Sequence, residues 1–363
     1  MSASPSFIKL WSSKLSDSIN CLAVGKPFLE ELSEENDILI GTTAGRVMIL
    51  NQTKPVEGLL ETKGGSIQSI QLHDLTGFGA LDLAVGDCDG IVTLFSRQQI
   101  LSKRDLGSAI TDITIHHDLT GSCEIIAGDI NGSLTSFQQH DALWKINIAE
   151  ESAKLATLGS VGILTSHAYR CTMLIRYDRK DDNHLLYDIW IGYDLFTCMR
   201  RLAIGSFHTK WRENTIFAIA KRYQLSHFIS EEGLKRFISN HPNKKIRKDS
   251  KKIDLRQVLF AGQDGFVYIM IDFEIFQWFY VGFCLTKIIQ FRPSTLKTHE
   301  SDIVLCTGHS NEVAIYQDGE KISSIKTSDW PHAITLGDVN ADGKDELILG
   351  SLDQMIEVYE WRQ

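Results

Sequence analysis

The stretch Asp82-Leu-Ala-Val-Gly86-Asp-Cys-Asp-Gly90-Ile-Val-Thr-Leu-Phe95 decides the fold of this chain. It consists of an acidic residue, a short apolar strand, a glycine, a turn, a second glycine and a second strand. Residues 37–50 and 124–137 repeat the same order. A pattern that recurs along a chain is typical of repeat architectures, in which each copy builds one supersecondary unit.

The copies recur at a nearly constant interval. Gly41, Gly86 and Gly128 each follow the first apolar strand of a copy, and weaker copies place glycines at positions 262, 308 and 350. Neighbouring glycines are roughly 45 residues apart, which is the period of propeller blades. The interval between positions 128 and 262 equals about three such periods. We therefore expect at least one further copy there, with residues 215–220 and 224–228 as its strands.

Two further strands accompany each copy. The preceding strand alternates apolar and polar residues, as in 70–74, 113–118 and 334–338, and the following strand is seen in 100–103, 143–148 and 321–325. Four short strands per period, separated by Gly, Asp and Asn turns, predict antiparallel blades rather than βαβ units. The sequence thus predicts an all-β fold, one β-propeller spanning residues 1–363, and the six visible copies plus the long interval favour eight blades.

The two ends of the chain are predicted to meet. The last copy stops at Trp361 after its third strand, so the final blade lacks an outer strand. Residues 7–15 resemble the fourth strands of the other copies and precede the first inner strand. Pairing residues 7–15 with 356–361 would close the ring and remove an exposed sheet edge.

The composition favours some classes of protein over others. The 363 residues are 43% hydrophobic and carry 37 Lys and Arg against 46 Asp and Glu, a net charge of −9. This balance gives no attraction to nucleic acid or to an anionic membrane surface. The first ten residues lack the order of a signal peptide, and the longest apolar stretch is shorter than the ~20 residues of a membrane span. Seven scattered cysteines argue against a disulfide framework, so we expect a cytoplasmic protein without direct membrane insertion.

One segment interrupts the strand pattern. Residues 239–253 are polar and basic and lie between two strand copies. A nuclear-localisation or nucleic-acid patch would need support elsewhere in an acidic chain, and none is present. We expect a solvated, flexible loop.

The sharpest local motif is the nine-residue segment 338–346. It places oxygen-bearing side chains at Asp338, Asn340 and Asp342, a glycine at the sixth position and a carboxylate at Glu346. Calcium prefers 6–8 oxygen ligands, and alternate residues of a tight loop direct oxygens inward. The motif predicts a weak calcium site formed by these four side chains and the Lys344 carbonyl. The alternative is that the carboxylates only hold the turn through hydrogen bonds. No cofactor is expected to be required.

Two related loops depart from this spacing. The loop that begins at Asp74 has Phe78 where a ligand oxygen should be, and the loop from Asp118 to Glu124 is two residues shorter. We expect the aspartates there to accept backbone N–H bonds in Asx-type turns.

Catalytic patterns are not recognised, and we expect no catalytic or cofactor-binding residues. The neighbours His116 and His117 precede Asp118, but adjacent strand residues point to opposite faces and cannot converge on one ion. The sequence has no G-x-S-x-G motif, P-loop, G-x-G-x-x-G motif or H-E-x-x-H spacing. A binding protein is therefore predicted, and an enzyme with a site in the central channel is the alternative.

The aromatic residues divide into two groups. Four tryptophans lie in or beside strand segments and are expected in the core: Trp144, Trp190, Trp278 and Trp330. Residues 276–280 (Phe-Gln-Trp-Phe-Tyr) are dense enough in aromatics that part of them is expected on a protein-binding surface.

The segment 338–350, a calcium-type loop followed by a short buried strand, resembles the FG-GAP repeats of integrin alpha chains. In that family seven such repeats form a propeller and some loops hold calcium, so the resemblance implies seven blades. The degenerate loops at Asp74 and Asp118 depart from the family pattern.

Residues 331–350 are similar to blades of intracellular relatives, namely the FG-GAP repeat-containing subunit of the KICSTOR complex and, more weakly, the propeller subunits of the Bardet-Biedl complex. Residues 156–162 and 263–269 favour the KICSTOR resemblance. That resemblance implies a scaffold that binds other protein subunits and acts at the lysosomal surface in nutrient control of TOR kinase. The Bardet-Biedl resemblance implies a coat-like cargo adaptor at the base of the cilium.

Overall fold

The structure is a computed structural model of the chain. It describes residues 6–26, 35–51, 54–55, 60–97, 99–117, 123–139, 141–147, 228–240, 257–262, 264–271, 274–297 and 299–362. The proposed hidden strands at 215–220 and 224–228 lie outside these residues except for Phe228, and Trp190 and residues 156–162 lie outside them altogether.

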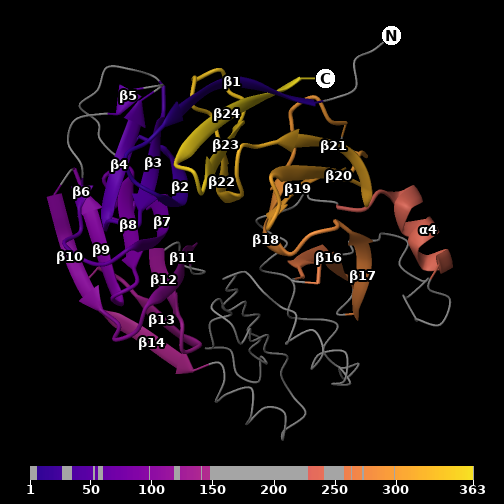
Figure 1. The fold of residues 1–363 in the computed structure, drawn as a ribbon. Helices are drawn as coiled ribbons and strands as arrows, with labels where there is room; N and C mark the ends of the chain where they lie inside the picture. Colours follow the sequence, from indigo (N-terminus) through magenta and orange to yellow (C-terminus); the bar gives the residue numbers. More distant parts are fainter. Residues whose placement is uncertain are drawn as a thin grey trace, which may run out of the picture.

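The described strands form six antiparallel sheets (Figure 1). The first sheet consists of β2(Ile19–Gly25), β3(Asp37–Thr42), β4(Arg46–Asn51) and β5(Lys54–Pro55), and β6(Leu60–Glu61) also pairs with β4. The second sheet consists of β7(Ile67–His73), β8(Asp82–Asp87), β9(Ile91–Ser96) and β10(Gln99–Asp105), and the third of β11(Ile110–His117), β12(Cys123–Asp129), β13(Ser133–Phe137) and β14(Ala142–Asn147). The fourth sheet consists of β15(Gln257–Ala261), β16(Phe266–Ile271) and β17(Glu274–Tyr280). The other two are β18(Leu285–Phe291), β19(Ile303–Gly308), β20(Glu312–Gln317) and β21(Glu320–Lys326); and β22(Pro331–Gly337), β23(Glu346–Ser351), β24(Met355–Arg362) and β1(Ser6–Lys14).

The first strands β2, β7, β11, β18 and β22 lie around a common centre, as Figure 1 shows. Strand β2 contacts both β7 and β22, β7 contacts β11, and β18 contacts β22. The later strands of each sheet extend outward from this ring, so each sheet is one blade. The predicted all-β architecture of antiparallel blades is confirmed, and four of the six described sheets have four strands.

The second strand is the most deeply buried strand in four of the blades. Every residue of β3, β8, β19 and β23 is buried, whereas β10 and β21 are largely exposed. Neighbouring blades cover both faces of the second strands, which explains their continuous apolar runs.

The repeated glycine allows the next blade to approach. A Cβ on Gly86 would lie 2.7 Å from Cγ2 of Ile110, and one on Gly350 would lie 2.6 Å from Cγ2 of Ile19. Ile110 and Ile19 each begin the first strand of the following blade. The glycine of the last blade therefore packs against the first inner strand of the chain, and only a residue without a side chain fits there.

The chain ends pair as predicted. Strand β1 is antiparallel to β24, with Phe7 opposite Trp361 and Ser13 opposite Ile356. The pairing completes the four-stranded blade β22–β23–β24–β1, so the predicted closure is confirmed.

A helix not predicted from the sequence, α4(Glu231–Asn240), lies outside β17 and beside the blade of β20 and β21 (Figure 1). Phe237 packs edge-on against Phe276 of β17, with ring centroids 5.1 Å apart. Ser239 and Asn240 are the last residues of α4, so the predicted 239–253 loop begins inside a helix; residues 241–253 lie outside the described ranges.

Candidate functional site

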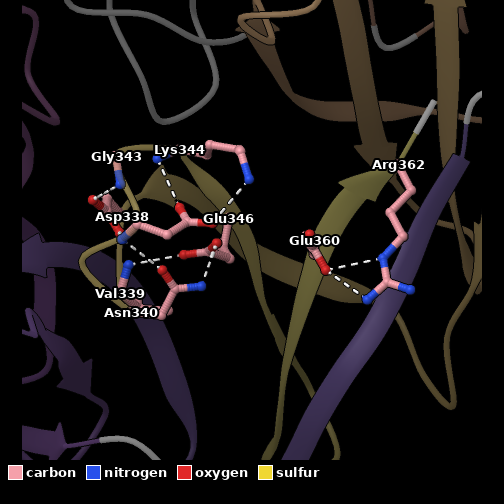
Figure 2. Close-up of polar contacts among 9 residues, drawn as sticks. Asp338, Val339, Asn340, Gly343, Lys344, Glu346, Glu360 and Arg362 are labelled. Atoms are coloured by element: carbon pink, nitrogen blue, oxygen red, sulfur yellow. Dashed lines mark hydrogen bonds and ion pairs between the residues drawn. The ribbon is translucent and has the colours of Figure 1, made fainter.

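The predicted calcium loop joins β22 to β23, and the structure brings its predicted residues together in one turn (Figure 2). Asp338 begins the loop, and its carboxylate accepts the backbone N–H groups of Asp342 at 3.2 Å and Gly343 at 2.8 Å. The Asn340 side-chain oxygen accepts the same Asp342 N–H at 2.9 Å. The loop is thus folded around acceptor oxygens that face its own backbone.

Glu346 holds the buried end of the loop. It is fully buried at the start of β23. Its Oε2 accepts the Val339 N–H at 2.9 Å, and its Oε1 accepts the Asn340 amide at 3.0 Å (Figure 2). Burial raises the pKa of the Glu346 carboxyl, because the charged form loses solvation.

Asp342 and Lys344 form the exposed end. The Asp342 carboxylate accepts the Lys344 backbone N–H at 2.9 Å and pairs with the Lys344 ammonium at 3.1 Å. The hydrogen bond from the ammonium lowers the pKa of Asp342 and raises that of Lys344. The lysine side chain therefore competes with any cation for the Asp342 carboxylate.

The oxygens of Asp338, Asn340 and Glu346 accept hydrogen bonds from the loop itself, as expected if these side chains hold the turn. Among the described residues, no group of three or more His, Cys, Asp or Glu side chains is arranged to hold a metal ion. Residues Asp338, Asn340, Asp342 and Glu346, with the Lys344 carbonyl, remain a predicted calcium site.

The degenerate loop at Asp74 forms the expected Asx-type turn. The Asp74 carboxylate accepts three successive backbone N–H groups, those of Gly77, Phe78 and Gly79, at 2.7–3.1 Å. Phe78 is 75% exposed at the loop tip. Residues 118–122 of the second degenerate loop lie outside the described ranges.

A buried acid lies within one residue of the start of the second strand in five blades. Each acid binds a loop or strand of its own blade. The acids and partners are Asp37 with Asn51, Asp82 with Leu75 and Thr76, Glu124 with Ser136, Asp302 with Gln290 and Arg292, and Glu346 with Val339 and Asn340. These acids hold blade geometry and are not gathered at one site.

The other motifs are dispersed. His116 and His117 are adjacent in β11, opposite Glu124 and Cys123 of β12. In β17, Phe276 and Phe279 are buried while Tyr280 is 57% exposed.

The expectation that Trp330 lies in the core is wrong. It is not a core residue: it is 39% exposed, and its ring stacks on His309 with centroids 4.7 Å apart and planes 14° apart. An alignment of the residues that precede the first strand would have singled out Trp330, because the equivalent residues of four other blades are Ser18, Ser66, Ala109 and Cys284.

No helix within the described ranges is long and apolar enough to span a membrane. Comparison with models of protein families finds no match, and no curated protein matches the sequence.

Solved structures do resemble this fold. A crystal structure of BBS1N in complex with ARL6DN, soaked with mercury, has a TM-score of 0.61 at 10% identity, covering 99% of this chain and 98% of that one. The lead-soaked form has a TM-score of 0.58 at 11% identity, covering 98% and 97%. The WD40 β-propeller domain of Doa1 has a TM-score of 0.54 at 9% identity, with the same coverage. This chain is a β-propeller.

Proposed function

We propose that this propeller is a non-catalytic scaffold that binds other protein subunits of a multi-subunit intracellular complex. The observation that carries the proposal is the engagement of the buried acids within their own blades. Acid–base chemistry would use carboxylates such as these, but here they hold the loops and strands of their own blades. We therefore assign the function of the propeller to its surface. The fold likeness to BBS1N, which was crystallised in complex with ARL6DN, supports protein recognition by such a fold.

The proposed role is KICSTOR-like: the propeller helps to place a regulator of nutrient signalling to TOR kinase at the lysosomal surface. The support is the resemblance of residues 331–350 to FG-GAP blades. The second candidate is a cargo adaptor of a ciliary coat, which the likeness to BBS1N favours at the level of fold.

Affinity purification of the tagged full chain from its native organism, followed by mass spectrometry, tests the role. The untagged parent strain is the control. Recovery of KICSTOR-like subunits in near-equal amounts supports the main proposal, and recovery of ciliary coat subunits replaces it by the second. A chain that is purified without any stoichiometric partner contradicts both.

The alternative of an enzyme has its own test. Turnover of a small molecule by the pure chain, lost on changing polar residues of first strands such as Gln71 of β7 or Thr335 of β22, would overturn the scaffold proposal. We expect no such turnover.

A further inference from the structure

The residue that precedes the first strand has the same backbone role in five blades. Its carbonyl accepts the N–H of the first residue of the turn between the second and third strands. The pairs are Ser18 with Thr43 at 3.1 Å, Ser66 with Cys88 at 2.9 Å, Ala109 with Ile130 at 2.9 Å, Cys284 with His309 at 2.9 Å and Trp330 with Leu352 at 3.1 Å. Four blades use Ser, Ala or Cys at this place, so blade formation does not require the indole of Trp330.

The Trp330 ring instead makes a ledge across two blades. It leaves the linker between β21 and β22 and stacks on His309, which lies in the turn between β19 and β20. Leu352, 46% exposed, lies in the next turn and is tied to the Trp330 carbonyl. His309, Trp330 and Leu352 thus form one exposed surface, hereafter the Trp330 ledge.

The backbone under the ledge is fixed on both sides. The Trp330 N–H bonds the Asp329 carboxylate at 2.8 Å. The Asn311 amide donates to the Ser328 carbonyl at 3.3 Å, and the Ser328 hydroxyl donates to the Asp353 carboxylate at 2.6 Å. A preorganised aromatic surface loses little conformational freedom when a partner binds.

The charge beside the ledge is negative. Asp329 and Asp353 flank it, and neither forms an ion pair with any described residue. Lys326, the last residue of β21 before this linker, is already paired with Glu312 at 2.5 Å. Tryptophan is the best aromatic partner for a cationic side chain, and uncompensated carboxylates add to that attraction.

We propose that the Trp330 ledge is a docking site for a protein segment that presents an arginine or lysine beside apolar side chains. The cation lies over the indole and is shared with Asp329 and Asp353, while the apolar side chains cover Leu352. This proposal rests on the proposed function, since it names the surface through which the scaffold holds one partner.

The probe is a phage-displayed library of random twelve-residue peptides, selected on the full chain. The test variant is Trp330→Ser, which installs the residue found at Ser18 and Ser66, and the control is Phe78→Ser, which removes a more exposed aromatic from a loop at the other end of the strands. We expect selected peptides to contain Arg or Lys next to apolar residues. Their affinity should fall about tenfold or more in Trp330→Ser, as for tryptophan at an interface centre, and stay unchanged in Phe78→Ser.

Two further variants keep the test decisive if Trp330→Ser lowers the melting temperature. Leu352→Thr installs the residue found at the equivalent position Thr43, and Asp353→Asn removes one negative charge. Each variant should bind the selected peptides more weakly, and Asp353→Asn should also reduce the salt dependence of binding. Acidic selected peptides, peptides whose affinity is the same for all variants, or a selection without enrichment would overturn the ledge. Native partners retained by Trp330→Ser would reject the ledge and leave the scaffold function standing, whereas a wild-type chain without partners would reject the function itself.

Discussion

Phe7 of β1 lies opposite Trp361 of β24, and their rings pack edge-on with centroids 5.0 Å apart. Both rings also contact Phe291 of the preceding blade, at 5.3 and 5.7 Å. Residues near the two ends of the chain therefore join the last blade to its neighbour through one aromatic cluster.

Replacing Phe7 by Ala should destabilise the propeller by about 3 kcal/mol, because a buried aromatic side chain is lost from this cluster. Urea denaturation measures the free energy of unfolding. Phe78→Ala is the matched control and should change it by less than about 0.5 kcal/mol, since Phe78 is exposed. Equal effects of the two changes would mean that the Phe7 ring adds no more to stability than an exposed aromatic side chain.

Calcium, if it binds, should stabilise the chain through the loop of Asp338, Asn340, Asp342 and Glu346. A ligand that binds only the folded state adds about 1.4 kcal/mol at ten times its dissociation constant. Asp342→Ala should then lower the melting temperature more in calcium than in chelator.

Asp74→Ala is the control for the calcium experiment, because Asp74 holds a similar turn through three N–H bonds in a loop where Phe78 replaces a ligand. It should lower the melting temperature equally in calcium and in chelator. If Asp342→Ala behaves in the same way, the carboxylates of 338–346 only hold the turn. A wild-type melting temperature unaffected by millimolar calcium removes the metal site.

The attachment of α4 should depend on Asp318. Its carboxylate accepts the Ser230 N–H at 2.9 Å and the Ser230 hydroxyl at 2.7 Å, and it pairs with Arg236 at 3.4 Å. Asp318→Ala should cost about 2 kcal/mol, because it removes hydrogen bonds to a charged acceptor. The backbone φ of Asp318 is 53°, which Asp or Asn tolerates better than Ala does.

Hydrogen exchange of the α4 amides measures this attachment. We expect faster exchange in Asp318→Ala and a smaller increase in Asp318→Asn, which keeps an acceptor oxygen. Unchanged exchange in both variants would show that the packing of Phe237 on Phe276 suffices.

Asp87 should make stability depend on pH. Its Oδ1 accepts the N–H groups of Asp89 and Ile91 at 3.0 and 2.9 Å, while its Oδ2 is buried without a hydrogen-bond partner among the described residues. Burial raises the pKa of this carboxyl. The folded state therefore holds the proton more tightly than the unfolded chain does, and the resulting stability is present below the unfolded pKa of about 3.9 and lost as pH rises through the folded pKa.

Asp87→Asn removes this titration. The melting temperature of the variant relative to wild type should therefore be higher at pH 7.5 than at pH 4.5. A difference between the two proteins that is the same at both pH values would show that the burial of Asp87 has no effect on its titration.

The blade pattern was readable in the sequence because it is local. The runs that end at Gly86 and Gly350, and the alternating strands before and after them, identify the strands of β8 and β23 without knowledge of their neighbours. The same holds for the loop 338–346, whose side chains bond residues at most seven positions away, although the Asp338 carbonyl also accepts the distant Asn36 amide at 2.7 Å. The closing pair of strands was also predictable, since one blade lacked a strand and the N-terminal segment supplied its sequence pattern.

The helix α4 could not be predicted in the same way. Its buried residue Phe237 packs against Phe276 of β17. At the start of the helix, the Ser230 hydroxyl accepts the Gly233 N–H and donates to the Asp318 carboxylate of a later blade. A short isolated helix is marginal in water, so tertiary packing rather than local propensity determines whether it forms.

The sequence by itself determined the propeller blades, their closure and the acidic turn, because period, glycine position and side-chain type are properties of short segments. Only the tertiary structure decided that Trp330 lies at the surface on His309 and beside Leu352. Whether a large aromatic side chain is buried depends on which distant segments come to cover it. For Trp330 those segments are two turns of different blades, and they leave its ring partly open to solvent.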